Sequence, residues 1–329
     1  MTIARAALLI RIASVVVATS TALLHTNGWA QEFPSRQITI IVPVPPGGGT
    51  DTFARFIAQK LSTSFGRTVL VDNRPGASST IGTGAVVRSQ PDGHTLLYVS
   101  SVIVLMNTFN TDLTFDPRRD LAPISMTVFI PQILLTHPSL PVRNVKELLA
   151  LAKAKPGALS YGSGGFGGAQ HLAMELLKLK TGIDVYHVPY RGAAPIQVSL
   201  LSGETQIGFL VIPVVQAHLK TGKMRALGLS ARKRSTILPD IPTLHESGIT
   251  DFEALQWQGF FVPAKVPQPV IDRLNQEIVK ALAAPDMTER LAVEGAEIVG
   301  STPRDFATFY QKEFTKWTDV LKHAGAKRD

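Results

Sequence analysis

Two glycine-rich segments are the places in this sequence where residue types and spacing point to chemistry. The first reads VPVPPGGGTD over residues 42–51, and the second reads GSGGFGG over residues 162–168. Each follows a strand-like run and precedes a helical one, and a glycine turn lets the backbone approach a ligand because no Cβ intervenes. The first amides of a helix lack partners within it and carry partial positive charge, so each segment could bind a carboxylate or a phosphate. One such turn alone is more often a tight connection without a ligand, but two favour a cleft that binds an anion from two sides.

Further candidates surround these two segments. The loop RPGASSTIGTG, residues 74–84, has hydroxyls that could line the cleft or only cap a helix. His171 lies in the first turn of the helix after the second segment, where it could face the cleft or be packed. Arg191 ends a strand-like run and could bind a carboxylate in bidentate fashion or form a salt bridge. The residues predicted on these grounds to contact the ligand are Val44, Gly47, Gly48, Gly49, Thr50, Asp51, Ser78, Ser79, Ser163, Gly164, Gly165, Phe166, Gly167, Gly168, His171 and Arg191.

Motifs of catalysis are missing from this sequence. Residues 162–167 match the dinucleotide pattern G-x-G-x-x-G, but the next strand-like run ends in Val-Pro-Tyr-Arg, without the acid that would hold a ribose. Neither segment ends in the Gly-Lys-Ser/Thr of a P-loop, no G-x-S-x-G elbow occurs, and the eight histidines form no metal-binding motif. We therefore predict no catalytic residue, no metal and no cofactor. An exported enzyme acting on an anionic molecule in the same cleft stays the alternative, and a dinucleotide-dependent dehydrogenase is a third possibility.

Size and composition favour a folded protein with two cores. The chain has 329 residues, of which 45% are apolar and 18% are charged. It contains no cysteine, which excludes a disulfide scaffold and a cysteine metal site. The net charge of +8 comes from scattered basic residues, with the densest cluster at residues 232–234. This scatter argues against nucleic acid as a partner and is compatible with an anionic small ligand.

The first 30 residues differ from the rest of the chain. They contain Arg5 and Arg11 but no acid, an apolar stretch over residues 12–24, and small residues before Gln31. This pattern predicts a secretory signal peptide over residues 1–30, cleaved near Ala30. A membrane anchor is the other interpretation, but the apolar stretch is short of the roughly 20 residues that a span needs. We expect an exported and soluble mature chain.

Strand and helix signals alternate from Arg36 onward, which predicts an α/β fold with largely parallel sheets. Helices are expected after both glycine segments, the first capped by Asp51 and starting at Thr52, and ended by Gly66 and Gly182. The chain after Gln268 is expected to be almost entirely helical. The strand-like runs are residues 38–44, 69–71, 95–100, 132–136, 159–161, 185–188, 206–212 and 224–230.

Six segments of the mature chain, in order from Pro34, resemble the exported solute receptors of tripartite tricarboxylate transporters, also called Bug-type receptors. The resemblance covers the whole mature chain and is specific when the segments are taken together. The segments are PSRQITIIVPVPPGGGTDTFAR, VDNRPGASSTIGTGAVVRSQPDGHTLLYVSS, DPRRDLAPIS, LSYGSGGFGGAQHLAMELLK, VYHVPYRGAAPIQVSLLSGETQIGF and WQGFFVPAKVPQPVIDRLNQEI.

This resemblance implies a periplasmic binding protein-like fold of type II, or Venus flytrap, with two α/β domains around a central ligand cleft. Domain 1 would comprise residues 31–130 and 257–329, and domain 2 residues 131–256. The first glycine loop and the start of the second helix would bind a carboxylate, often through bridging waters. The implied partners are a small carboxylated solute and either membrane transporter subunits or a sensor protein, and we expect a monomer.

The sequence departs from the family pattern at three places. Gly168 stands where the family commonly has threonine, so one hydroxyl ligand is missing. The third loop, usually Gly-Ala-Gly-Gly, is bulkier and more polar over residues 77–80. Leu210 and Val211 stand where an aspartate is usual, and we add both to the predicted ligand-binding residues. These changes favour a monocarboxylate or an aromatic acid over citrate.

Overall fold

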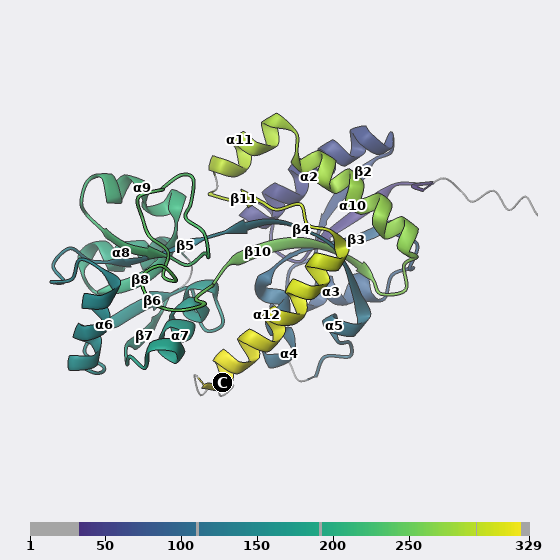
Figure 1. The fold of residues 1–329 in the computed structure, drawn as a ribbon. Coiled ribbons are helices and arrows are strands. Elements are labelled where there is room, and N and C mark those ends of the chain that lie inside the picture. The colour runs from purple at the N-terminus through teal and green to yellow at the C-terminus, as the bar shows by residue number, and fades with distance from the viewer. Residues whose placement is uncertain (1–32, 110–111, 191–192, 294, 324–329) are drawn as a thin grey trace, which may run out of the picture. The chain divides into compact units, whose positions relative to one another are not determined.

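The strands form two separate sheets in the residues that the computed structural model describes, which are 33–109, 112–190, 193–293 and 295–323 (Figure 1). Residues 36–329 make one compact unit, and both sheets belong to it. Residues 1–32, which hold the predicted signal peptide and its cleavage site, lie outside the described residues. The predicted α/β class is confirmed by the alternation of strands and helices along the chain.

The first sheet has six strands in the order β11-β4-β10-β3-β1-β2. Strand β1 runs parallel to both β2 and β3, whereas β10 is antiparallel to β3 and β4, and β11 is antiparallel to β4. Four of the five residues of β1 are fully buried or nearly so, as expected for a continuous apolar strand inside a sheet. The strands are β1 (Ile38–Val42), β2 (Val69–Asn73), β3 (Thr95–Ser100), β4 (Leu121–Ile130), β10 (Gln256–Pro263) and β11 (Glu297–Ile298).

The second sheet has five strands in the order β7-β6-β8-β5-β9. Strand β6 is parallel to β7 and β8, but β5 is antiparallel to β8 and β9. The prediction of largely parallel sheets is therefore wrong, because β5 and β10, the strands that follow each passage of the chain between the sheets, run antiparallel to their neighbours. The strands are β5 (Gln132–Thr136), β6 (Ser160–Ser163), β7 (Tyr186–Pro189), β8 (Ile207–Val211) and β9 (Arg225–Leu229).

The helices connect and cover these strands, and their ends follow the predicted stop signals where glycine is present. Gly66 and Gly182 cap two of them in the left-handed conformation that glycine adopts without strain. The helices before residue 200 are α2 (Gly49–Phe65), α3 (Thr80–Val87), the 3-10 helix η1 (Ser101–Leu105), α4 (Met106–Phe109), α5 (Pro117–Asp120), α6 (Val145–Ala154), α7 (Ala169–Thr181) and α8 (Ala193–Ser202). The later ones are α9 (Ile212–Lys220), α10 (Gln268–Leu282), α11 (Pro285–Val293) and α12 (Pro303–His323).

Most of the described chain after Gln268 lies in helices α10, α11 and α12, joined by short connections and the two residues of β11, which confirms the prediction for it. Thr302, directly before α12, caps this helix: the Asp305 amide donates to Thr302 Oγ1 at 3.1 Å, and Thr302 Oγ1 donates to the Asp305 carboxylate at 2.7 Å. Further along α12, the buried Glu313 carboxylate accepts hydrogen bonds from Trp257 Nε1 at 3.1 Å and Trp317 Nε1 at 2.9 Å. One buried anion thus ties α12 to strand β10.

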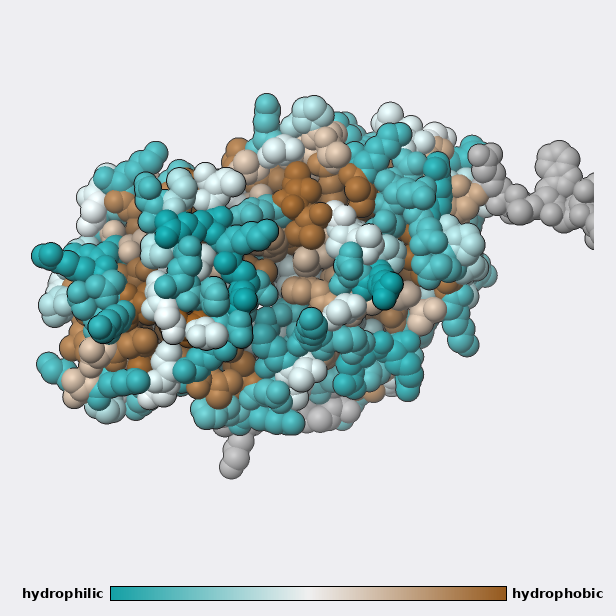
Figure 2. Space-filling view, in the orientation of Figure 1, coloured by the Kyte–Doolittle hydropathy of each residue, from teal (hydrophilic) through white to brown (hydrophobic). Residues whose placement is uncertain are grey.

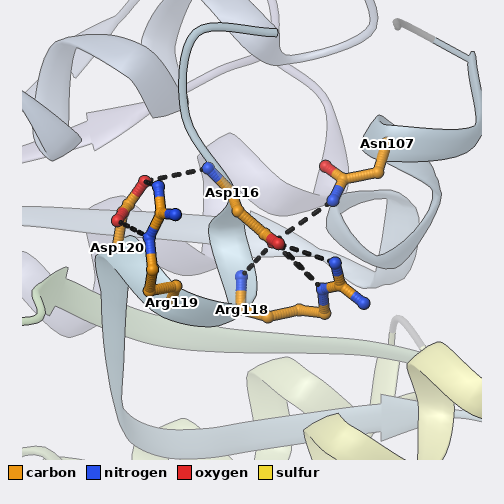
Figure 3. A network of polar contacts seen from close by, with 5 residues as sticks. All are labelled: Asn107, Asp116, Arg118, Arg119 and Asp120. Carbon is orange, nitrogen blue, oxygen red and sulfur yellow. Dashed lines mark hydrogen bonds and ion pairs between the residues drawn. The ribbon is translucent and has the colours of Figure 1, made fainter.

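A polar network fixes the segment between α4 and β4 (Figure 3). Asp116 caps α5 by accepting from the Arg118 amide at 3.0 Å, and it also accepts from the Arg118 guanidinium at 2.6 Å and from Asn107 Nδ2 at 3.2 Å. The Arg118 hydrogen bonds hold the pKa of Asp116 at about 2, well below its ordinary value. Asp120 accepts from the Asp116 amide at 2.9 Å and pairs with Arg119.

Hydrophilic side chains cover most of the face shown in Figure 2, and hydrophobic ones gather in separate patches between them. Over the described part of the chain, no helix combines the length and the apolar character that a membrane span requires.

Candidate ligand-binding site

The first glycine loop connects the carboxyl end of β1 to α2. Gly47 has a φ of +91°, which only glycine adopts readily, and Gly48 is the N-cap of α2 without any side-chain cap. Residues 47–49 are exposed, and Val44 and Thr50 are half-buried. The prediction that Asp51 caps a helix starting at Thr52 is wrong, because the helix begins three residues earlier, at Gly49.

Asp51 instead shapes the loop from inside the first turn of α2. Its carboxylate is 3% exposed and accepts from the Gly47 amide at 2.9 Å, from Arg55 Nε at 3.0 Å and from Asn73 Nδ2 at 2.9 Å. Burial by itself would raise the pKa of Asp51, but these hydrogen bonds outweigh it and the pKa lies below its ordinary value. The carboxylate is therefore ionised and occupied by partners within the protein.

The second glycine loop connects the carboxyl end of β6 to α7 in the same way. Gly165 and Gly167 have φ values of +110° and +73°, and Gly168 is the N-cap of α7, again without a side-chain cap. Phe166 at the tip of this loop is 50% exposed. Helices α2 and α7 thus begin alike: each follows a strand with parallel neighbours, β1 of the first sheet and β6 of the second.

Several amides of the predicted glycines already have acceptors within the protein. The Gly165 amide donates to Ser163 Oγ at 3.1 Å, the Gly167 amide to His171 Nδ1 at 3.4 Å, and the Gly168 amide to the Gly165 carbonyl at 3.2 Å. The amides that follow, at Ala169 and Gln170, belong to the first turn of α7, where a helix provides no acceptor. The predicted ligand-binding residues therefore omit Ala169 and Gln170, whose amides lack an acceptor within the helix. The predicted start of a helix after the second glycine loop was the signal that could have identified them.

A buried cluster lies behind the second loop and was not predicted. Ser163 is fully buried, and its Oγ lies 2.6 Å from His187 Nε2. His171 is 2% exposed and packs against His187, with ring centroids 4.7 Å apart. Burial first, and the neighbouring His187 second, lower the pKa of His171 to about 4, and burial also lowers that of His187. The pairing of β7 with β6 brings His187 here, and no spacing in the sequence reveals that pairing.

The Ser163–His187 pair does not have the arrangement of a catalytic nucleophile. Besides contacting His187, the buried Ser163 Oγ donates to the Gly165 carbonyl and accepts from the Gly165 amide, both at 3.1 Å. A nucleophile has to be presented to a substrate, whereas this hydroxyl is enclosed and holds its own loop. Among the residues with described positions, no group of three or more histidine, aspartate or glutamate side chains could hold a metal ion.

The third predicted loop is tied to the first. Ser79 is the N-cap of α3 but its hydroxyl does not cap the helix; it donates to the Pro43 carbonyl at 3.2 Å. Ser78 is exposed, and residues 77–79 all have φ values between +45° and +73°. Three consecutive non-glycine residues in the left-handed region are strained, and such strain often accompanies functional sites.

The remaining predicted residues lie less favourably or cannot be placed. Leu210 is fully buried in a core with Ile133 and Ile196, so its side chain is not presented to a ligand in this conformation. Val211 is half-buried and is the N-cap of α9. Arg191 lies outside the described residues.

Three cavities lie apart from the predicted ligand-binding residues, none of which lines them. A cavity of about 530 Å³ beside β9 and one of about 700 Å³ beside Arg119 include none of the predicted residues. A much smaller one, about 10 Å³ and thus large enough for roughly one water, adjoins the start of α7 at Ala169. It is lined also by Gln132, whose Nε2 donates to the Ala169 carbonyl at 3.3 Å, and by Trp317.

Comparison with known proteins gives one consistent family. Residues 53–326 match the model of the tripartite tricarboxylate transporter family receptor. Protein BugT of Bordetella pertussis is 36% identical over 300 residues, which cover 91% of this chain and 92% of that protein.

Two solved structures of similar proteins contain an organic acid. Rpa4515 of R. palustris with adipate has a TM-score of 0.73 and 32% identity, and the match covers 89% of this chain and 99% of that one. MatC of Rhodopseudomonas palustris with bound malate has a TM-score of 0.69 and 29% identity, over 88% and 100% of the two chains.

Proposed function

Since this chain belongs to the tripartite tricarboxylate transporter receptor family, we propose that it captures a small carboxylated solute with the first turns of α2 and α7. It is a solute-binding receptor of the periplasmic type and not an enzyme. The observation that carries the proposal is the matched start of the two helices, one on each sheet, with a glycine N-cap and no side-chain cap. Amides at such ends, aided by the helix dipole, favour an anion.

The anchoring amides are those of residues 49–51 and 169–171. Helix geometry gives them no acceptor within the helix, whereas the Gly47, Gly165, Gly167 and Gly168 amides are used by the loops themselves. This assignment keeps the two predicted loops but moves the contact to their helical ends. Arg55 offsets the Asp51 charge beside the first anchor and Asn73 donates to the same carboxylate, which lowers the repulsion that Asp51 exerts on an anion.

Binding works by closure in this proposal. The two sheets would act as two domains, residues 31–130 with 257–329 and residues 131–256, and a ligand that contacts both helix ends would favour the closed state over the open one. The energy of closure comes from contacts that exist only when both ends reach the same carboxylated molecule.

The solute proposed is a monocarboxylate or an aromatic acid more than citrate. The half-exposed ring of Phe166 on the second loop and the half-buried Val211 offer apolar surface near the anchor. A second or third carboxylate would need donors beyond the two helix ends.

The proposal includes export and delivery. The signal peptide over residues 1–30 would be removed near Ala30, and the mature chain would act in the periplasm as a monomer. Its partners would be the membrane subunits of a transporter or a sensor protein. The similarity to protein BugT and to the two acid-bound receptors supports this role.

Isothermal titration of the mature chain, residues 31–329, tests the function. The protein is purified without exposure to organic acids, and its fold is verified by circular dichroism. Adipate, malate, citrate and benzoate are then titrated into it. At least one acid should bind saturably with a stoichiometry of one. If a folded chain gives no heat with any of these acids or with a wider carboxylate panel, the proposed function is wrong.

A further inference from the structure

Four aromatic rings pack one against the next in a column from the tip of the second glycine loop into the core; the His187–Tyr161 pair is stacked and the other two pairs are tilted. The ring centroids of Phe166 and His171 are 4.6 Å apart, those of His171 and His187 4.7 Å, and those of His187 and Tyr161 4.9 Å. Phe166 is half-exposed, whereas Tyr161 is fully buried. The column therefore connects the exposed end of the loop with strand β6, and the two imidazoles occupy its middle.

Both imidazoles also bond to the loop, His171 directly to its backbone and His187 through the Ser163 side chain. His187 Nε2 lies 2.6 Å from Ser163 Oγ, which in turn bonds both the amide and the carbonyl of Gly165. His171 Nδ1 accepts from the Gly167 amide at 3.4 Å, which it can do only while that nitrogen carries no proton. The loop conformation is thus coupled to the hydrogen-bonding state of two histidines.

The charges that face this pair are already matched to each other. On α7, the Glu175 carboxylate accepts from Tyr161 Oη and from Lys178 Nζ, each at 2.9 Å. Glu175 raises and Lys178 lowers the pKa of both histidines, and burial lowers both more strongly than either. In the free protein the pair is therefore neutral near pH 7, and only a new negative charge close by would stabilise a proton there.

We propose that His187, acting through Ser163, is the positioning residue of the second glycine loop and takes up a proton when a carboxylate binds at the start of α7. This inference rests on the proposed function. Its consequence is an affinity that rises as the medium becomes more acidic, since the bound state holds the extra proton. Each unit by which the anion raises the pKa of His187 adds about tenfold to the affinity once the pH lies below the pKa of the free protein, and less between the free and the bound pKa.

The test measures affinity against pH in variants matched in shape. His187→Gln keeps a neutral hydrogen-bonding group near Ser163 but cannot be protonated. The control is His218→Gln on α9, the helix that follows strand β8 of the same sheet. Titrations at pH 7.5, 6.5 and 5.5 use whichever acid of the panel above binds most tightly. Because the acid's own protonation is identical for every protein, the ratio of wild-type to variant affinity isolates the histidine.

The expected ratio of wild-type to His187→Gln affinity is about one at pH 7.5 and at least threefold at pH 5.5, while His218→Gln follows the wild type throughout. Ser163→Ala should weaken binding at every pH, because the loop loses its tie to Gly165. A ratio for His187→Gln that stays constant with pH, while all proteins bind, overturns the inference and leaves the proposed function intact. Absence of binding in the wild type at every pH refutes the proposed function instead.

If His187→Gln does not fold, a second measurement on the wild type tests the inference. The histidine proton resonances of the wild type are followed with pH, with and without the same acid. A rise in the pKa of His187 on binding supports the inference, and an unchanged or lower pKa overturns it.

Discussion

Gly165→Ala should weaken ligand binding by distorting the second glycine loop without any steric collision. The Gly165 φ is +110°, and a Cβ built there meets no atom within 4 Å, so only the backbone conformation opposes a side chain. Such a conformation costs a residue other than glycine about 1–3 kcal/mol. Gly164→Ala is the matched control on the same loop, because its Cβ would lie 3.6 Å from Gln170 Oε1, which is ordinary contact.

The cost of Gly165→Ala is transferred to binding if the free loop relaxes. The Gly165 amide and carbonyl are both bonded to Ser163 Oγ, and the carbonyl also accepts from the Gly168 amide at 3.2 Å. A relaxed loop releases these bonds and turns the N-cap of α7 away from its present orientation. Restoring the geometry on binding would then consume about 1–3 kcal/mol, which corresponds to an affinity loss of about 5- to 150-fold.

Isothermal titration and thermal unfolding of three proteins, wild type and the two alanine variants, check this expectation. Gly164→Ala should bind within about twofold of the wild type and unfold at a similar or slightly higher temperature, since alanine restricts the unfolded chain. Gly165→Ala should bind more weakly by the stated factor. Wild-type affinity in Gly165→Ala, or an equal loss in both variants, would refute the role assigned to the loop geometry.

Two further predictions concern stability, and urea unfolding followed by circular dichroism checks both. Glu313→Ala leaves the buried Trp257 and Trp317 N–H groups without their acceptor and should lower the free energy of unfolding by about 3 kcal/mol. Glu313→Gln keeps one acceptor oxygen and should lower it by about 1 kcal/mol. Equal losses in the two variants would contradict this. Asp116→Asn should cost about 1 kcal/mol at pH 7, the value discounted because Arg118 is 48% exposed. Because the Asp116 pKa is lowered to about 2, its contribution exists above the ordinary carboxyl pKa and is lost as the pH falls toward 2, so the difference from the wild type should shrink between pH 4 and pH 2. A pH-independent difference would point to packing instead.

The sequence predicted those strands whose residues form continuous apolar or β-branched runs, and it missed β4, β10 and the two-residue β11, which pair with partners far along the chain. Strand β4 contains Pro123, which cannot donate to a ladder, and the pairing shifts register where β10 passes it, between Phe260 and Phe261. Strand β10 contains Gly259, where a Cβ would lie 2.5 Å from the Phe306 ring of α12. Both irregularities come from partners far along the chain, so no local window of residues could indicate them.

For the site, the sequence located the loops but not the atoms that the loops use internally. The glycines at positive φ could be recognised as glycines in the sequence, and α2 and α7 begin two residues after Gly47 and Gly167. The sequence predicted Asp51 as an N-cap, whereas it is the third residue of α2 and accepts from the Gly47 amide. An acid is common at both positions, so the sequence cannot separate them while the first helical residue is unknown. His187 was invisible for a different reason, since it contacts Ser163 only through the pairing of two strands separated by a whole helix.

Anchoring an anion by main-chain amides has a consequence for how such a receptor acquires its specificity. The anchor depends on where α2 and α7 begin, so it tolerates exchange of the side chains around it as long as the glycine turns persist. Discrimination between acids then falls to the side chains near the helix ends, of which Phe166 and Val211 are apolar. The charges of Asp51 and Glu175 contribute little to this discrimination, because Arg55 and Lys178 are bonded to them. A receptor of the proposed kind would select by the body of the acid, and the proposed proton uptake at His187 would let the pH of the medium adjust how tightly the carboxylate is held.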